Sequence, residues 1–97
     1  MRLIWTRQAK NHLREIVSYI ATDNLTAART IKERIERRAT HLERQPLMGR
    51  SGAIDGTRET IPHPSYRIVY QVTEEAVFIL AIVHTSRKWP PHMEDDD

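Results

Sequence analysis

The hydrophobic pattern changes its period once along the chain, and this change constrains the fold more than any other feature. Between residues 7 and 44, apolar side chains recur every three or four positions, which is the spacing of one helix face. After residue 56 they alternate or run continuously, as they do in strands. The pattern therefore predicts an α+β fold with a helical part followed by a sheet.

Two helices account for the first part of the pattern. The first is expected over residues 7–21, with Thr6 as its N-cap, and the second over residues 25–44. Residues 22–24 favour caps and turns, so the two helices should form an antiparallel hairpin. Their apolar positions are Ala9, Leu13, Ile16, Val17 and Ile20 in the first helix and Ala28, Ile31, Ile35, Ala39 and Leu42 in the second.

Four strands are expected around this hairpin, at residues 2–5, 57–61, 66–72 and 76–84. A glycine-containing loop over residues 45–56 separates the helices from the later strands. Pro62 should end the second strand, and residues 73–75 should join the last two strands in a hairpin.

The order of the strands follows from their polarity. Residues 76–83 are apolar on both faces, which places this strand in the middle of the sheet with the opening strand on its far side. The predicted order is β-α-α-β-β-β, with the helical hairpin packed on a small, mainly antiparallel sheet. In the strand before it, Tyr66, Ile68, Tyr70 and Val72 should share one face, and Arg67, Val69 and Gln71 the other.

Length and charge indicate one small domain. The 97 residues have room for a single core, which we assign to residues 1–93. Residues 94–97 are four acids and are expected to form a disordered tail. Without them, 15 basic residues face 9 acidic ones, so the net charge rises from +2 to +6. This charge favours nucleic acid or an acidic protein segment as a partner, although it serves solubility equally well.

Several classes of activity lack their motifs. The chain has no cysteine, no Gly-rich phosphate loop, no HExxH and no GxSxG, which argues against nucleotide hydrolysis, zinc proteolysis and serine hydrolase chemistry. The five histidines show no ligand-like spacing, so no metal site and no cofactor are expected. No apolar run reaches the length of a membrane span and no signal peptide is evident, so the cytoplasm is the expected location.

Basic side chains in the strand half are the candidates for chemistry. If neighbouring strands align, Arg58, Arg67 and His84 could point to one face, where guanidinium and imidazole groups suit phosphates. An RNase acting through the ribose 2′-hydroxyl would use His84 as acid or base and arginine to stabilise the pentacoordinate phosphate. The alternative is structural: Arg58 would pair with a carboxylate, and the backbone would satisfy His84.

Trp89 directly follows Arg87 and Lys88. An aromatic side chain next to basic residues can serve as a platform for nucleic-acid bases. A tryptophan just beyond a final strand can instead close the open end of a small core. We favour the second interpretation.

Short blocks of residues occur in a characteristic order along nearly the whole chain. They are Trp5-Thr6 with Ala9, Leu13-Arg14-Glu15-Ile16, Asn24 with Ala27-Ala28, residues 46–50, 56–59, 66–70 and 82–84, and finally Arg87, Trp89 and Pro90. As an ordered set they resemble the ParE/RelE superfamily of toxins from bacterial type II toxin-antitoxin systems. The resemblance implies a compact β-α-α-β-β-β domain, in agreement with the order predicted from periodicity.

The resemblance also implies partners. A cognate, ParD-like antitoxin would wrap the toxin and bind operator DNA itself, so that the toxin meets the operator only indirectly. No membrane partner is implied. ParE-like members of the superfamily poison DNA gyrase, whereas RelE-like members cut mRNA on the ribosome.

The blocks at residues 56–59 and 84–90 look like the ParE branch, and Thr85 stands where a RelE-like nuclease would have a tyrosine. The leading hypothesis is thus a gyrase inhibitor that is not an enzyme. Its expected target-binding surface comprises Arg58, Arg67, His84, Arg87 and Trp89. The alternative is a ribosome-dependent endoribonuclease using Arg67, His84 and Arg58, although no acidic general base is evident near the first two.

Overall fold

The computed structural model describes residues 1–91, so the predicted acidic tail and the last two residues of the predicted domain lie outside the described residues. In chain order the elements are β1 (Arg2–Trp5), α1 (Arg7–Asp23), α2 (Leu25–Leu42), β2 (Arg50–Ser51), β3 (Arg58–His63), β4 (Tyr66–Val72) and β5 (Ala76–His84).

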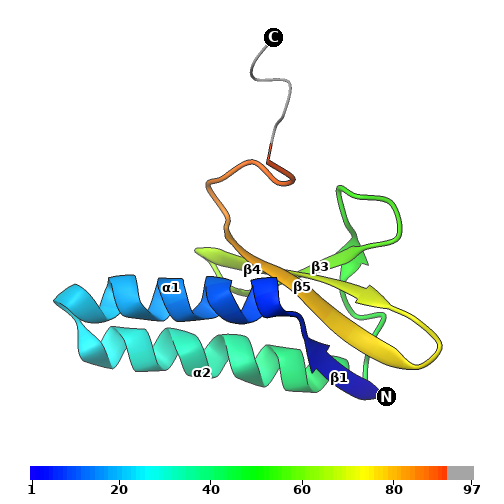
Figure 1. Ribbon diagram of the computed structural model, residues 1–97, viewed down its shortest axis with the longest axis horizontal. Helices are drawn as coiled ribbons and strands as arrows, with labels where there is room; N and C mark the ends of the chain where they lie inside the picture. Colours follow the sequence, from blue (N-terminus) through cyan, green and yellow to red (C-terminus); the bar gives the residue numbers. More distant parts are fainter. Residues whose placement is uncertain (92–97) are drawn as a thin grey trace, which may run out of the picture.

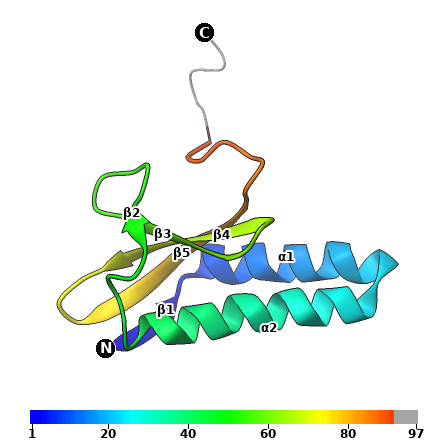
Figure 2. The ribbon, with the colours of Figure 1, turned by 180° about the vertical axis from the view of Figure 1, so that it is seen from behind.

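The strands form one mixed sheet in the order β1-β5-β4-β3-β2. Among the strands of residues 1–91, the pairing of β1 with β5 is parallel and the other three pairings are antiparallel. Figure 1 shows the two helices side by side as one layer on one face of the sheet, with α1 against β5 and α2 against β3. The same two layers are seen from behind in Figure 2. The predicted α+β class, the helical hairpin and the central position of the last strand are confirmed.

Both helices begin at residues whose side chains satisfy free backbone amides. Thr6 Oγ1 accepts a hydrogen bond from the Ala9 amide at 3.2 Å, and it donates to the Ile79 carbonyl at 2.8 Å. Asn24 Oδ1 accepts from the Ala27 amide at 2.9 Å, while the Asn24 amide caps the end of α1 at Ile20 O. One residue therefore ends α1 and starts α2, which makes the hairpin tight. Neither helix is long and apolar enough to cross a membrane.

The sheet has a different core on each face. The helix-covered face holds the main core, which includes Tyr66, Ile68 and Tyr70 of β4. On the opposite face a smaller cluster of Val69, Ala81 and Val83 is covered in part by Leu80 and Trp89. The predicted alternation along β4 is confirmed for these positions, and Trp89 packs as the predicted plug.

Two predictions about strands were wrong. Within residues 45–56, expected to be only loop, Arg50–Ser51 forms a short edge strand, so the order is β-α-α-β-β-β-β. The strand expected to end before Pro62 continues to His63. The β3–β4 register is irregular between Thr60 and His63, and this irregularity accommodates Pro62, which has no amide hydrogen to donate to a ladder.

Candidate target-binding groove

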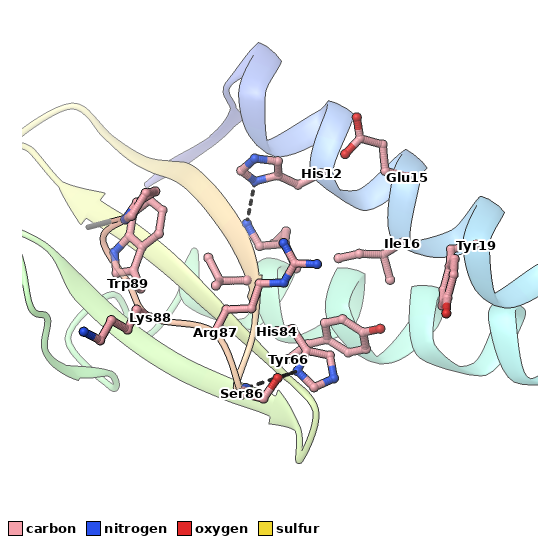
Figure 3. Close-up of a pocket in the computed structure, with 13 residues that line it drawn as sticks. His12, Glu15, Ile16, Tyr19, Tyr66, His84, Ser86, Arg87, Lys88 and Trp89 are labelled. Atoms are coloured by element: carbon pink, nitrogen blue, oxygen red, sulfur yellow. Dashed lines mark hydrogen bonds between the residues drawn. The ribbon is translucent and has the colours of Figure 1, made fainter. Parts of the chain in front are cut away.

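A groove of about 710 Å³ lies between α1 and the segment that follows β5. It runs beside the last residues of β5, beyond the stretch that pairs with β1 (Figure 3). The residues that line it are His12, Glu15, Ile16 and Tyr19 from α1, Tyr66 from β4, and Ile82, Val83, His84, Ser86, Arg87, Lys88, Trp89 and Pro91 from β5 and beyond.

The α1 wall of the groove is built from one helix face. Positions 12, 15, 16 and 19 follow the i, i+3, i+4, i+7 spacing, which brings their side chains to the same side of α1. His12 Nδ1 accepts a hydrogen bond from the Ile82 amide at 3.2 Å and thereby ties α1 to the free edge of β5. Tyr19 is 81% exposed, unusual for a large aromatic side chain, and is available to a partner.

Tyr66 and His84 form the floor of the groove. The β4–β5 register places them opposite each other, and their rings meet edge to face with centroids 5.2 Å apart. His84 Nδ1 accepts from the Ser86 amide at 3.1 Å and lies 2.7 Å from Ser86 Oγ, which holds the imidazole ring in place. Burial, and secondarily the nearby Tyr19, raises the pKa of Tyr66, so its phenol stays neutral at physiological pH.

The third wall carries the positive charge. Arg87 extends toward α1 across the middle of the groove in Figure 3. Its backbone amide donates to the His84 carbonyl at 3.0 Å, and this turn directs the chain away from β5. Trp89 lines one end of the groove while it covers the small core, and its buried Nε1 atom has no hydrogen-bond partner among residues 1–91.

Three of the five residues predicted as a target surface, His84, Arg87 and Trp89, meet in this groove. The expectation that Arg67 and His84 share a sheet face was wrong. Arg67 pairs with Val83, whereas His84 pairs with Tyr66, which belongs to the helix-covered core. Because neighbouring residues in a strand point to opposite faces, Arg67 lies on the face away from the helices.

Arg67 has a structural partner. Its Nη1 atom lies 3.0 Å from Glu59 Oε1 in an ion pair, and Nη2 donates to the Thr85 carbonyl at 3.4 Å. Glu59 is only 4% exposed, and its second oxygen accepts from the Ala53 amide at 3.0 Å. We expected no carboxylate near Arg67, and this was wrong. Both oxygens of the Glu59 carboxylate already have partners, however, in Arg67 and the Ala53 amide.

Arg58 lies apart from both Arg67 and the groove. It pairs with Tyr70, on the helix-covered side of the sheet near the β2 edge. Its Nη1 atom donates to the carbonyls of Gly49 at 2.7 Å and Leu47 at 3.3 Å, and so anchors the loop before β2. The interpretation of Arg58 as a structural residue predicted a carboxylate as its partner. Its partners are backbone carbonyls instead.

No residue of α1 was among the predicted site residues, because only the apolar spacing of this helix was interpreted. The signal was present: an aromatic residue, Tyr19, at helical spacing from His12 on a side that is not the centre of the apolar face. Among residues 1–91, no group of three or more histidines and acids is placed to hold a metal ion.

Comparison with known proteins adds three findings. Residues 3–89 match the family model described as the ParE toxin of the type II toxin-antitoxin system parDE. A candidate toxin of Sinorhizobium fredii, Y4kP, is 36% identical over 90 residues, which span 92% of this chain and 93% of that protein. A solved chain of the chromosomal ParDE toxin-antitoxin system from P. aeruginosa superimposes with a TM-score of 0.78 at 23% identity, covering 87% of this chain and 95% of the other. The last match concerns the fold alone.

Proposed function

We propose a mode of action for this chain, which belongs to the ParE toxin family of type II toxin-antitoxin systems: it inhibits DNA gyrase by binding it through the α1–β5 groove. In this proposal the toxin has no catalytic step of its own. It stabilises the topoisomerase on cleaved DNA and so blocks replication.

The side chains of the groove carry the proposal. Protein interfaces concentrate their binding energy in tryptophan, tyrosine and arginine, and Tyr19, Arg87 and Trp89 line the same hollow. Tyr19 is exposed in the free toxin, so its burial by a partner removes apolar surface from water. A rigid helix and a sheet edge position these side chains before binding, which lowers the entropic cost of association.

The placement of the basic residues also supports a binding protein over a ribonuclease. A nuclease of the predicted type would need Arg67 and His84 around one phosphate. The two residues point to opposite faces of the sheet, and Arg67 is engaged by Glu59 and the Thr85 carbonyl.

We further propose that the cognate antitoxin neutralises the toxin by direct binding over the same groove. A segment of the antitoxin lying between α1 and β5 would cover Tyr19 and Arg87 and exclude gyrase by competition. Operator DNA would then be contacted through the antitoxin.

A plasmid supercoiling assay with purified gyrase and ATP tests this function. We expect the wild-type chain to inhibit supercoiling with trapped cleaved plasmid, and added antitoxin to relieve the inhibition. Tyr19→Ala should raise the concentration for half-inhibition about tenfold or more, because a buried interfacial tyrosine contributes roughly 1.4 kcal/mol or more.

Leu25→Ala is the matched control, since Leu25 is also a large apolar side chain, 55% exposed, but lies outside the groove. It should inhibit like wild type. Equal inhibition by the two variants would argue against the groove as the gyrase site. Normal supercoiling in a large excess of folded wild-type chain would remove the gyrase proposal itself.

A further inference from the structure

A second surface of the molecule, remote from the groove, carries a row of arginines that form no ion pair within residues 1–91. It lies where α2 packs against β3. Arg34 Nη2 donates to the Pro62 carbonyl at 2.9 Å, and Arg38 donates to Thr60 Oγ1. These two contacts define the flank of α2 that faces β3. Arg37 follows Arg34 by three positions, so it lies next to Arg34 on the helix surface, and it is exposed to solvent.

The guanidinium groups of Arg34 and Arg38 are fixed by hydrogen bonds that do not neutralise their charge. Within the described part of the chain the one ion pair closer than 4.0 Å joins Arg67 to Glu59, so neither Arg34, Arg37 nor Arg38 is paired. Arg34 and Arg38 are fixed by neutral oxygens, which orient a guanidinium but leave its charge intact. Burial, and then the charge of Arg34, lowers the pKa of His63 at the end of β3, as expected for an uncompensated cation nearby.

The opposite flank of the same helix is different. Lys32 and Glu36 line a hollow with residues of α1, so this flank faces α1 and mixes both charges. On the β3-facing side, Glu33 lies one turn before Arg37, but among residues 1–91 it forms no ion pair with any of the three arginines. Three of the positive charges noted in the sequence therefore lie close together on α2, where a rise of four helix positions separates Arg34 from Arg38 by about 6 Å along the axis.

We propose that this α2–β3 arginine row, Arg34, Arg37 and Arg38, binds the phosphate backbone of duplex DNA. Guanidinium groups about one helix turn apart suit neighbouring phosphates of a duplex backbone. Single-stranded nucleic acid is bound largely by stacking on exposed aromatic side chains, and the row contains none. The choice of a DNA duplex over an RNA duplex rests on the proposed function, because the proposed target, gyrase, binds DNA. The row would contact the DNA while the groove contacts the enzyme.

Direct binding of the full chain to a labelled DNA duplex, measured by fluorescence anisotropy over a series of KCl concentrations, tests the proposal without gyrase. Three phosphate contacts predict a slope of log K against log salt of about −2.7, at about 0.9 per contact. Arg34→Gln with Arg37→Gln should reduce the slope to about −0.9 and weaken binding to all sequences equally. Arg38 is left in place because it contacts the buried Thr60.

Arg29→Gln with Lys32→Gln is the matched control, since it removes the same charge from the other flank of α2. It should keep the wild-type slope, and an equal loss in both double variants would overturn the proposal.

Arg37→Gln alone, at an exposed position, should reduce the slope by about 0.9 even if the double variant folds poorly. Saturating DNA should also raise the pKa of His63 measured by NMR, because phosphates offset the charge of Arg34.

The alternatives have their own outcomes. Equal or tighter binding to polyglutamate of matched charge would assign the row to an acidic protein segment instead. Tighter binding to an RNA duplex than to the DNA duplex would overturn the choice of DNA. Gyrase inhibition without DNA binding would refute this inference alone, whereas DNA binding without gyrase inhibition would refute only the proposed function.

Discussion

Replacing Arg67 by alanine should lower the free energy of unfolding by about 3 kcal/mol, because it leaves the carboxylate of Glu59 buried without its cation. Glu59 is 4% exposed, so water cannot replace the guanidinium. Arg67 itself is 18% exposed, which places the expected loss at the lower end of the range for buried pairs. Urea denaturation of the variant and the wild-type chain measures the difference.

Two further variants show whether the buried charge is the cause. Adding Glu59→Gln to Arg67→Ala removes the charge but keeps an oxygen for the Ala53 amide, so most of the lost stability should return. Arg29→Ala, at an exposed position on α2, should change stability by no more than about 0.5 kcal/mol. If the double variant is as unstable as Arg67→Ala, the loss comes from packing instead.

Gly49→Ala should destabilise the chain by a similar amount, about 3 kcal/mol, through overpacking and a lost hydrogen bond. A Cβ atom at this position would lie 2.6 Å from Tyr70 Oη and 2.7 Å from the Glu59 carbonyl oxygen. The carbonyl belongs to the backbone of β3, which is paired there with β2 and β4, and Tyr70 is restrained as well. Tyr70 is fully buried, its hydroxyl accepts from the Gly49 amide at 2.9 Å, and it donates to the Pro46 carbonyl at 2.8 Å.

A thermal-unfolding cycle with Tyr70→Phe tests this explanation. The phenylalanine removes the closest atom to the new methyl group, so the double variant should lose less stability than the sum of the single losses. Ser51→Ala, exposed on the neighbouring strand β2, should be close to neutral. Strict additivity of Gly49→Ala and Tyr70→Phe would show that the Tyr70 hydroxyl is not the obstacle.

Helix positions were predicted well because their determinants are local. The apolar spacing of Ile35, Ala39 and Leu42 and the caps at Thr6 and Asn24 act within one or two turns. Strand β5 was also placed correctly, since a strand that is apolar on both faces must be covered on both. The resemblance to ParE toxins rests on the same sequence and is shown at the level of the family.

The site was predicted less completely, for a reason that lies in β5 itself. A strand that is apolar on both faces does not indicate which side chains share a face with those of its neighbour. The register also shifts between Val69 and Tyr70 of β4. The sequence therefore did not reveal that His84 lies beside Tyr66 while Arg67 turns to the other face and meets Glu59.

The amino-acid sequence by itself determined the elements, their order and the family, because periodicity, caps and ordered motifs can be read along the chain. Only the tertiary structure decided which side chains work together. The groove forms where His12 of α1 meets Ile82 of β5, 70 positions away, and the arginine row exists because α2 docks on β3. Such contacts depend on strand register and on helix docking, which are set by packing between distant segments and leave no local pattern.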